Sequence, residues 1–190
     1  MKKLPQSTRI KILLKGYVSA DSGGRTRPTM TLIRNGKQTI LTDPGVTRNQ
    51  KVILDALKKE GLLPEKIDVV FITHGHTDHT RNIGFFAKAK ILDYFGWWKN
   101  DVFEDYKKGD LGAGIEIIKT PGHSYDGISL IIKTEKSDII ICGDVFWKKD
   151  FPKIDPFAED QKQLNKSRGE ILKLADYVVP GHGEMFKVKK

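Results

Sequence analysis

The chain has 190 residues, of which 38% are hydrophobic and 30% charged, and its net charge is +9. This length and composition suit one globular domain over residues 1–190 with a sizeable core. No stretch is apolar enough to span a membrane, and the single cysteine excludes an internal disulfide, so we expect a cytoplasmic protein with no membrane partner. The lysines are scattered along the chain, which favours a solvated surface over a nucleic-acid footprint.

Mostly strands are expected in the N-terminal half. The predicted elements are a strand at 9–18, a hairpin at 29–43, a helix at 48–61, a strand at 67–73 and another candidate strand at 89–93. The hairpin rests on the dipeptide Asn35-Gly36 between two β-rich runs, a strong turn signal. The helix rests on apolar side chains at helical spacing, with Gly61 as a stop.

The second half is expected to add strands and one long helix. The predicted elements are a strand at 114–120, two strands joined by a polar turn at 127–144, a helix at 159–175 and a strand at 176–180. Gly169 weakens the helix prediction, because glycine is a poor helix former. The order of elements predicts two sheets with helices outside them, a layered α/β architecture.

All five histidines lie in loops that follow predicted strands. Three fall in "FITHGHTDHT" (residues 71–80), one in "TPGHS" and one in "VPGHGE". The candidates are His74, His76, His79, His123 and His182, and Asp144 follows a predicted strand in the same way. Because sites are built on loops at the ends of strands, these side chains are expected to meet at one edge of the sheets.

Imidazole and carboxylate groups are ligands for divalent ions such as zinc, iron or manganese. The alternative is that each histidine is an ordinary polar side chain with a satisfied hydrogen bond. That explanation would have to hold for every histidine of the chain at once, each of them beside a glycine or an aspartate. The sequence therefore predicts a metal site.

The pattern His74-x-His76-x-Asp78-His79, followed by His123, Asp144 and His182, resembles the signature of the metallo-β-lactamase superfamily. The turn at Asp43 in "ILTDPG" is similar to an early element of the same family. The resemblance covers nearly the whole chain and suggests a small stand-alone member of the superfamily. It implies an α/β fold, the four-layer αβ/βα sandwich, with a metal centre at the loop edge of its two sheets.

The resemblance also implies a ligand set. His74, His76 and His123 would hold one ion, Asp78, His79 and His182 a second, and Asp144 would bridge both. Two divalent ions are expected, zinc first and iron or manganese as alternatives, with a bridging hydroxide as nucleophile. Asp78 and Asp144 are the candidate catalytic residues. Asp43 is either a hydrogen-bond acceptor that fixes a histidine ring or an ordinary turn aspartate.

Departures from known members of the superfamily restrict the substrate. Asp144 stands where the best-studied zinc β-lactamases carry cysteine, and Trp147 stands where the quorum-quenching lactonases carry tyrosine. The chain also lacks the additional histidine of the RNA-processing nucleases. Without that acid, a thiolate or enolate is the easier leaving group. We therefore expect a metal-dependent hydrolase of an ester- or thioester-like bond in a small-molecule substrate.

Two other activities and two kinds of partner stay open. One activity is a metal-dependent phosphodiesterase or ribonuclease, which would make RNA a partner, although a less favoured one. The other is a mononuclear iron persulfide dioxygenase that uses His74, His123 and Asp144. A non-catalytic metal-stabilised scaffold and a homodimer are also compatible with the sequence.

Aromatic residues are candidates for the wall of the substrate pocket. Residues 93–106 include Trp97 and Trp98, which would form either a lid over the metals or ordinary packing. Phe146 and Trp147 follow Asp144 directly and are better placed by sequence. The segment 22–28 is expected to be a loop with arginines that could meet a substrate anion.

Overall fold

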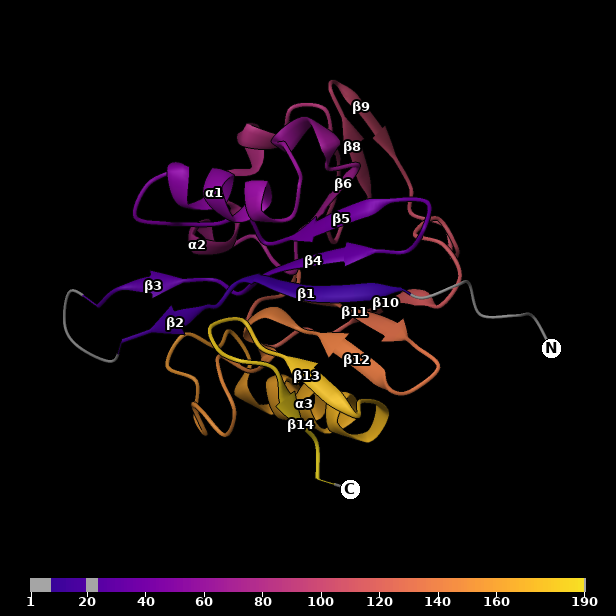
Figure 1. Ribbon diagram of the computed structural model, residues 1–190. Helices are drawn as coiled ribbons and strands as arrows, with labels where there is room; N and C mark the ends of the chain where they lie inside the picture. Colours follow the sequence, from indigo (N-terminus) through magenta and orange to yellow (C-terminus); the bar gives the residue numbers. More distant parts are fainter. Residues whose placement is uncertain (1–7, 20–23, 190) are drawn as a thin grey trace.

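Two mixed β-sheets face each other at the centre of the computed structural model, which describes residues 8–19 and 24–189 (Figure 1). The strands of the first sheet are, in spatial order, β1 (Arg9–Leu14), β4 (Met30–Arg34), β5 (Thr39–Thr42), β6 (Val69–Phe71), β7 (Lys90–Leu92), β8 (Trp97–Lys99) and β9 (Val102–Glu104). Those of the second sheet are β10 (Ile115–Lys119), β11 (Ile128–Lys133), β12 (Asp138–Ile141), β13 (Tyr177–Val179) and β14 (Phe186–Lys187). A small separate hairpin pairs β2 (Tyr17–Val18) with β3 (Thr26–Arg27).

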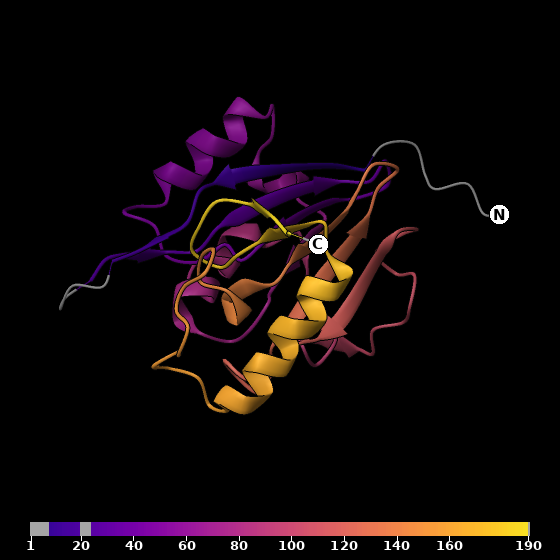
Figure 2. The same ribbon diagram turned by 90° about the horizontal axis from the view of Figure 1, so that it is seen from below.

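Helices cover the outer faces of both sheets. The α-helices are α1 (Lys51–Lys59), α2 (Thr77–Thr80) and α3 (Gln161–Leu174), and the 3₁₀ turns are η1 (Pro64–Lys66), η2 (Ile83–Phe86) and η3 (Gly143–Val145). α1 lies on the outside of the first sheet, and α3 runs across the outside of the second, as Figure 2 shows from below. The predicted four-layer αβ/βα sandwich is confirmed. In the described part of the chain, no helix has the length and apolar character needed to cross a membrane.

Neighbouring residues of the central strands pack into different layers. In β6, Val69 and Phe71 belong to the core between the sheets, whereas Val70 packs in the core under α1. In β11, Leu130 lies between the sheets and Ile131 lies in the core under α3. Side chains of a strand alternate between its two faces, so strands covered on both faces need apolar residues throughout. This explains the continuous apolar runs in the sequence.

Parallel strand pairs bring separate loops together at one edge of the sandwich. β5 and β6 run parallel with Thr42 opposite Phe71, so Asp43 lies beside the loop that starts after β6. β12 and β13 run parallel with Ile141 opposite Val179, so the segments that follow them are also neighbours. These registers set the positions of the residues described below.

The structure differs from the expected elements at two places. The predicted strand at 9–18 is split into β1 and β2, and Thr29 accepts the Gly16 N–H at the break through its hydroxyl oxygen, 3.2 Å away. Residues 93–106, expected as a lid or as packing, contain the paired strands β8 and β9 at the edge of the first sheet. The predicted hairpin at Asn35-Gly36 is confirmed.

Candidate metal centre

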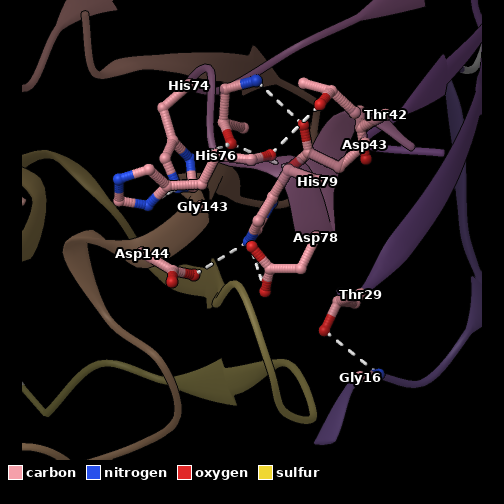
Figure 3. A network of polar contacts seen from close by, with 12 residues as sticks. Gly16, Thr29, Thr42, Asp43, His74, His76, Asp78, His79, Gly143 and Asp144 are labelled. Atoms are coloured by element: carbon pink, nitrogen blue, oxygen red, sulfur yellow. Dashed lines mark hydrogen bonds and ion pairs between the residues drawn. The ribbon is translucent and has the colours of Figure 1, made fainter. Parts of the chain in front are cut away.

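The histidines and acidic residues singled out from the sequence meet at the loop edge of the two sheets. The loop after β6 and the short helix α2 supply four of them, and two loops of the second sheet and the turn η3 supply the other three. The residues brought together are His74, His76, Asp78, His79, His123, Asp144 and His182. Figure 3 shows how the side chains from the first sheet and Asp144 point toward a common centre.

The first cluster consists of three imidazole nitrogens. His76 Nδ1 lies 3.1 Å from His74 Nε2 and 3.0 Å from His123 Nε2. A tetrahedral zinc ion with bonds of about 2.0–2.1 Å separates two nitrogen ligands by roughly 3.3 Å. The three nitrogens are therefore spaced as the ligands of one ion would be.

The second cluster combines two imidazoles with a carboxylate. His182 Nε2 lies 3.3 Å from His79 Nε2 and 3.4 Å from Asp78 Oδ2. Thr26 donates its hydroxyl to the same Asp78 oxygen over 3.2 Å. This set also has the composition and spacing of a divalent metal site.

Asp144 lies between the two clusters. Its Oδ1 is 3.3 Å from His79 Nε2, and its Oδ2 is 3.2 Å from His182 Nε2 and 3.5 Å from His123 Nε2. Within the described residues, Oδ1 is buried and accepts no hydrogen bond. A buried carboxylate oxygen normally has a partner, and a cation held by the adjacent imidazoles would provide one. Two ions therefore fit the residues present.

For most of the histidines, a hydrogen bond at Nδ1 determines that Nε2 is the nitrogen that faces the metal cluster. Asp43 Oδ2 lies 3.1 Å from His79 Nδ1, Asp155 Oδ2 lies 2.8 Å from His123 Nδ1, and the Arg27 carbonyl lies 3.0 Å from His182 Nδ1. Carboxylate and carbonyl oxygens can only accept, so each Nδ1 carries a proton and each Nε2 is the nitrogen that faces the clusters.

His74 is fixed in the same way through a short relay. Thr73 donates its hydroxyl to Asp43 Oδ2 over 2.8 Å, so its oxygen is free to accept from His74 Nδ1, 3.1 Å away. Asp43 Oδ1 also accepts the Thr73 backbone N–H over 2.8 Å (Figure 3). Asp43 is 2% exposed and holds two ligand positions in place, so it is the predicted acceptor behind a histidine rather than a simple turn residue.

The electrostatics of the site favour neutral imidazoles in the first cluster. Burial, reinforced by the neighbouring histidine His79, holds the pKa of His74 well below its ordinary value. Burial, with His123 as the next cause, also lowers the pKa of His76. Both rings are therefore neutral near pH 7, the form that binds a metal.

The second cluster is dominated by Asp144. Burial raises the pKa of Asp144, but His79 and His182 outweigh it and hold that pKa well below the usual range. Burial lowers the pKa of His79, whereas Asp144 and Asp43 raise it more, and the result lies well above the ordinary value. The Asp144 carboxylate is thus ionised at neutral pH, as a group shared between two cations must be.

A cavity of about 1100 Å³ opens over both clusters. His76, Asp78, His123, Asp144 and His182 line its floor, the β2–β3 hairpin forms one wall, and residues 147–159 form the other. In both views the hairpin and the 147–159 segment lie at the same end of the molecule (Figures 1 and 2).

Only one of the four aromatic candidates for the pocket wall lines this cavity, Trp147. The prediction is wrong for Trp97, which packs in the core between the sheets, and for Trp98, which stacks on Phe103 in the edge hairpin. It is also wrong for Phe146, which packs toward α3 and Phe186.

Of the predicted loop 22–28, Ser22 and Gly23 lie outside the described residues, Arg25 lines the cavity, and Arg27 donates its guanidinium to the Lys15 carbonyl. Asp155 is the residue that sequence reasoning missed, because an aspartate before a proline indicates only a turn.

Comparison with known proteins agrees with the geometry. The family model described as the metallo-beta-lactamase superfamily matches residues 23–96. Over 95% of its length the chain is 35% identical to the Xenopus laevis metallo-beta-lactamase domain-containing protein 1, of which it covers 82%. The chain belongs to the metallo-β-lactamase superfamily. It is also 35% identical to a probable metallo-hydrolase of Methanocaldococcus jannaschii, covering 95% of this chain and 90% of that protein.

Solved structures show the same superfamily fold at lower identity. A Thermotoga maritima protein provisionally classed as a metallo-beta-lactamase superposes with a TM-score of 0.75 at 21% identity, over 96% of this chain and 100% of that one. The dizinc quorum-quenching lactonase AidC gives a TM-score of 0.65 at 16% identity, over 84% and 73%. A protein solved in a di-iron-bound form gives 0.66 at 20% identity, over 85% and 90%. Together with the two clusters, the relatives identify a metal-dependent hydrolase of the superfamily.

Proposed function

We propose that this chain is a dinuclear metal-dependent hydrolase that cleaves an ester- or thioester-like bond in a small substrate. The observation that carries the proposal is that two ligand clusters share the carboxylate of Asp144 at the floor of a cavity. A single-ion enzyme would have no use for the second, complete cluster. The cavity is large enough for a small-molecule substrate.

When two divalent ions are bound, they would supply an activated water as nucleophile and polarise the carbonyl that it attacks. The residues of the chain hold this chemistry in place. Asp144 is ionised and buried, so it can balance two cations without reorganising. Asp78 is the more accessible carboxylate, with 26% of its side chain exposed, and it lines the cavity. It is therefore the group best placed to exchange a proton with a bound substrate or with water.

Zinc is the metal we propose first. Five of the seven donors are imidazoles, and a nitrogen-rich set of this kind suits zinc or iron better than magnesium or calcium. The dizinc lactonase and the di-iron protein of the same fold support both choices.

The leaving group is restricted by the absence of a spare histidine. All five histidines of the chain belong to the two clusters, so none is left to protonate a departing oxygen or nitrogen. A thiolate or a stabilised oxyanion departs without such an acid, whereas an amine or a simple alkoxide does not. This argument supports thioesters and activated esters over amides.

A substrate panel tests the proposal. Protein loaded with zinc, manganese or iron would be assayed against thioesters, activated esters, lactones, phosphodiesters and single-stranded RNA, with His76→Ala as the control. Turnover of thioesters or activated esters that disappears in His76→Ala is the expected result. Cleavage of RNA or phosphodiesters alone would replace the proposal with a phosphodiesterase. One bound iron and oxygen consumption with a persulfide would replace it with a dioxygenase.

A further inference from the structure

The wall of the cavity formed by residues 147–159 is unusually apolar for an exposed loop. Its cavity-lining apolar residues are Trp147, Phe151, Pro152, Ile154, Pro156 and Phe157. Ile154 is 78% exposed and Phe157 is 68% exposed, the largest exposed fractions among the large hydrophobic residues described. Apolar side chains that gather at the rim of a cavity, rather than singly on the surface, indicate a ligand that covers them.

Trp147 places one end of the wall beside the metal ligands. The Trp147 indole stacks on the Phe157 ring at 5.7 Å with planes 18° apart. The centre of the same indole lies 6.4 Å from the His123 ring and 6.4 Å from the His182 ring, so it sits beside both clusters. Trp147 therefore connects the exposed Phe157 ring to the side of the two clusters.

Hydrogen bonds hold the backbone of the 147–159 segment in place. Asp155, between Ile154 and Phe157, accepts from His123 Nδ1 and also accepts the Phe157 N–H over 2.9 Å. Arg168 of α3 donates to the Lys153 carbonyl over 2.9 Å. The exposed apolar side chains are thus presented by an anchored backbone, which lowers the entropic cost of binding a ligand.

We propose that this wall is a subsite for an apolar acyl group, so that the preferred substrates are esters or thioesters of medium-length fatty acids rather than of acetate. The inference rests on the proposed function and specifies its substrate class. A chain of several methylene groups can lie against the apolar side chains of this wall, and each methylene that leaves water tightens binding about fourfold. The ionised carboxylate of the product would stay at the metal ligands.

Calorimetry of product binding tests the subsite separately from catalysis. Octanoate and butanoate would be titrated into the zinc-loaded protein, and kcat/KM would be measured for 4-nitrophenyl octanoate and butanoate. Octanoate is expected to bind at least about tenfold tighter than butanoate. Phe157→Ala and Ile154→Ser should each reduce that ratio several-fold while the binding of butanoate stays nearly constant.

Phe95→Ala is the matched control, because Phe95 is 55% exposed but does not line the cavity. It should retain the wild-type ratio. A wild-type ratio near one, or an equal loss in Phe95→Ala, overturns the subsite. If no ester is hydrolysed but octanoate still binds preferentially through Phe157, the proposed function fails and the subsite stands.

Discussion

At the scale of single residues, the geometry of the metal centre depends on the groups that hydrogen-bond to its ligands. Four of the five histidines have an oxygen acceptor at Nδ1, and His76 alone faces its cluster with Nδ1. Such contacts fix the tautomer and the orientation of each ring before any metal binds. The ligand geometry is therefore built into the fold and does not have to be imposed by the ion.

Asp155 provides the clearest test of this view. Replacing it by asparagine keeps the side-chain volume but removes the charge that faces the His123 ring. Loss of a carboxylate in this position typically weakens metal binding by about 10- to 100-fold. We expect a reduction of that size for Asp155→Asn in competition titrations of zinc against a chromophoric chelator.

The control for this experiment lies five residues further along the chain. Asp160 caps α3 by accepting the Gln163 N–H over 2.9 Å and does not contact a metal ligand. Asparagine is an equally good cap, so Asp160→Asn removes the same charge without affecting the helix. If both variants bind zinc as the wild type does, Asp155 has no role in positioning His123.

The metal ligands could be predicted from the sequence, but the residues that hydrogen-bond to them could not. The ligand candidates were visible because each follows a strand and because histidines are otherwise absent. Asp155 contacts a residue 32 positions earlier, and no local pattern encodes a contact of that kind. Trp97 was misplaced for a similar reason, since its burial depends on the pairing of β8 with β7 and β9.

At the scale of elements, α3 has a well-capped N-terminus and a glycine in its interior that weakens it. Asp160 caps its first turn, and Leu164 and Ile171 bury its apolar face against the second sheet. Gly169 lies within the helix, and a Cβ built there would meet nothing within 4 Å. The glycine therefore costs helix stability without a packing reason that the structure shows.

Gly169→Ala should consequently stabilise the protein. Alanine in a helix interior is favoured over glycine by about 0.5–1 kcal/mol, mainly because the unfolded chain loses freedom. Chemical denaturation at fixed metal concentration should show an increase of that size with unchanged activity. Gly36→Ala is the counterpart: its site is equally open, but φ is +82°, so alanine there should destabilise. Lower stability in Gly169→Ala would mean that α3 has an unrecognised constraint.

Most elements were predictable because their signals are local. Helical spacing of apolar residues predicted α1, the Asn35-Gly36 turn predicted the β4–β5 hairpin, and apolar runs predicted β6, β11 and β12. The edge hairpin β8–β9 was not predicted, since its strands are three residues each and rich in aromatic and charged side chains. Short edge strands are defined by their partners more than by their own composition.

At the scale of the whole molecule, the metal ligands join the two halves of the sandwich. Each cluster takes ligands from both sheets: His74 and His76 meet His123, and Asp78 and His79 meet His182. Within each cluster, the histidine from the second sheet is therefore 47 residues or more along the chain from the ligands of the first sheet, as for His76 and His123. An ion bound at either position would act as a cross-link between the sheets.

Metal binding should therefore raise the stability of the entire fold and not only of the site. A ligand present at 100 times its Kd stabilises the folded state by about 2.7 kcal/mol per site, provided that it does not bind the unfolded chain. For a chain of this length that corresponds to a rise in Tm of roughly 5–10 °C per site, measured by calorimetry with zinc buffered at a fixed free concentration.

Magnesium is the control, because it prefers oxygen ligands and should leave Tm unchanged. In His123→Ala the first cluster loses one of its three histidines, so part of the zinc-dependent rise should disappear while the part due to Asp78, His79 and His182 remains. A protein that binds two zinc ions with no change in Tm would show that the ions do not connect the sheets.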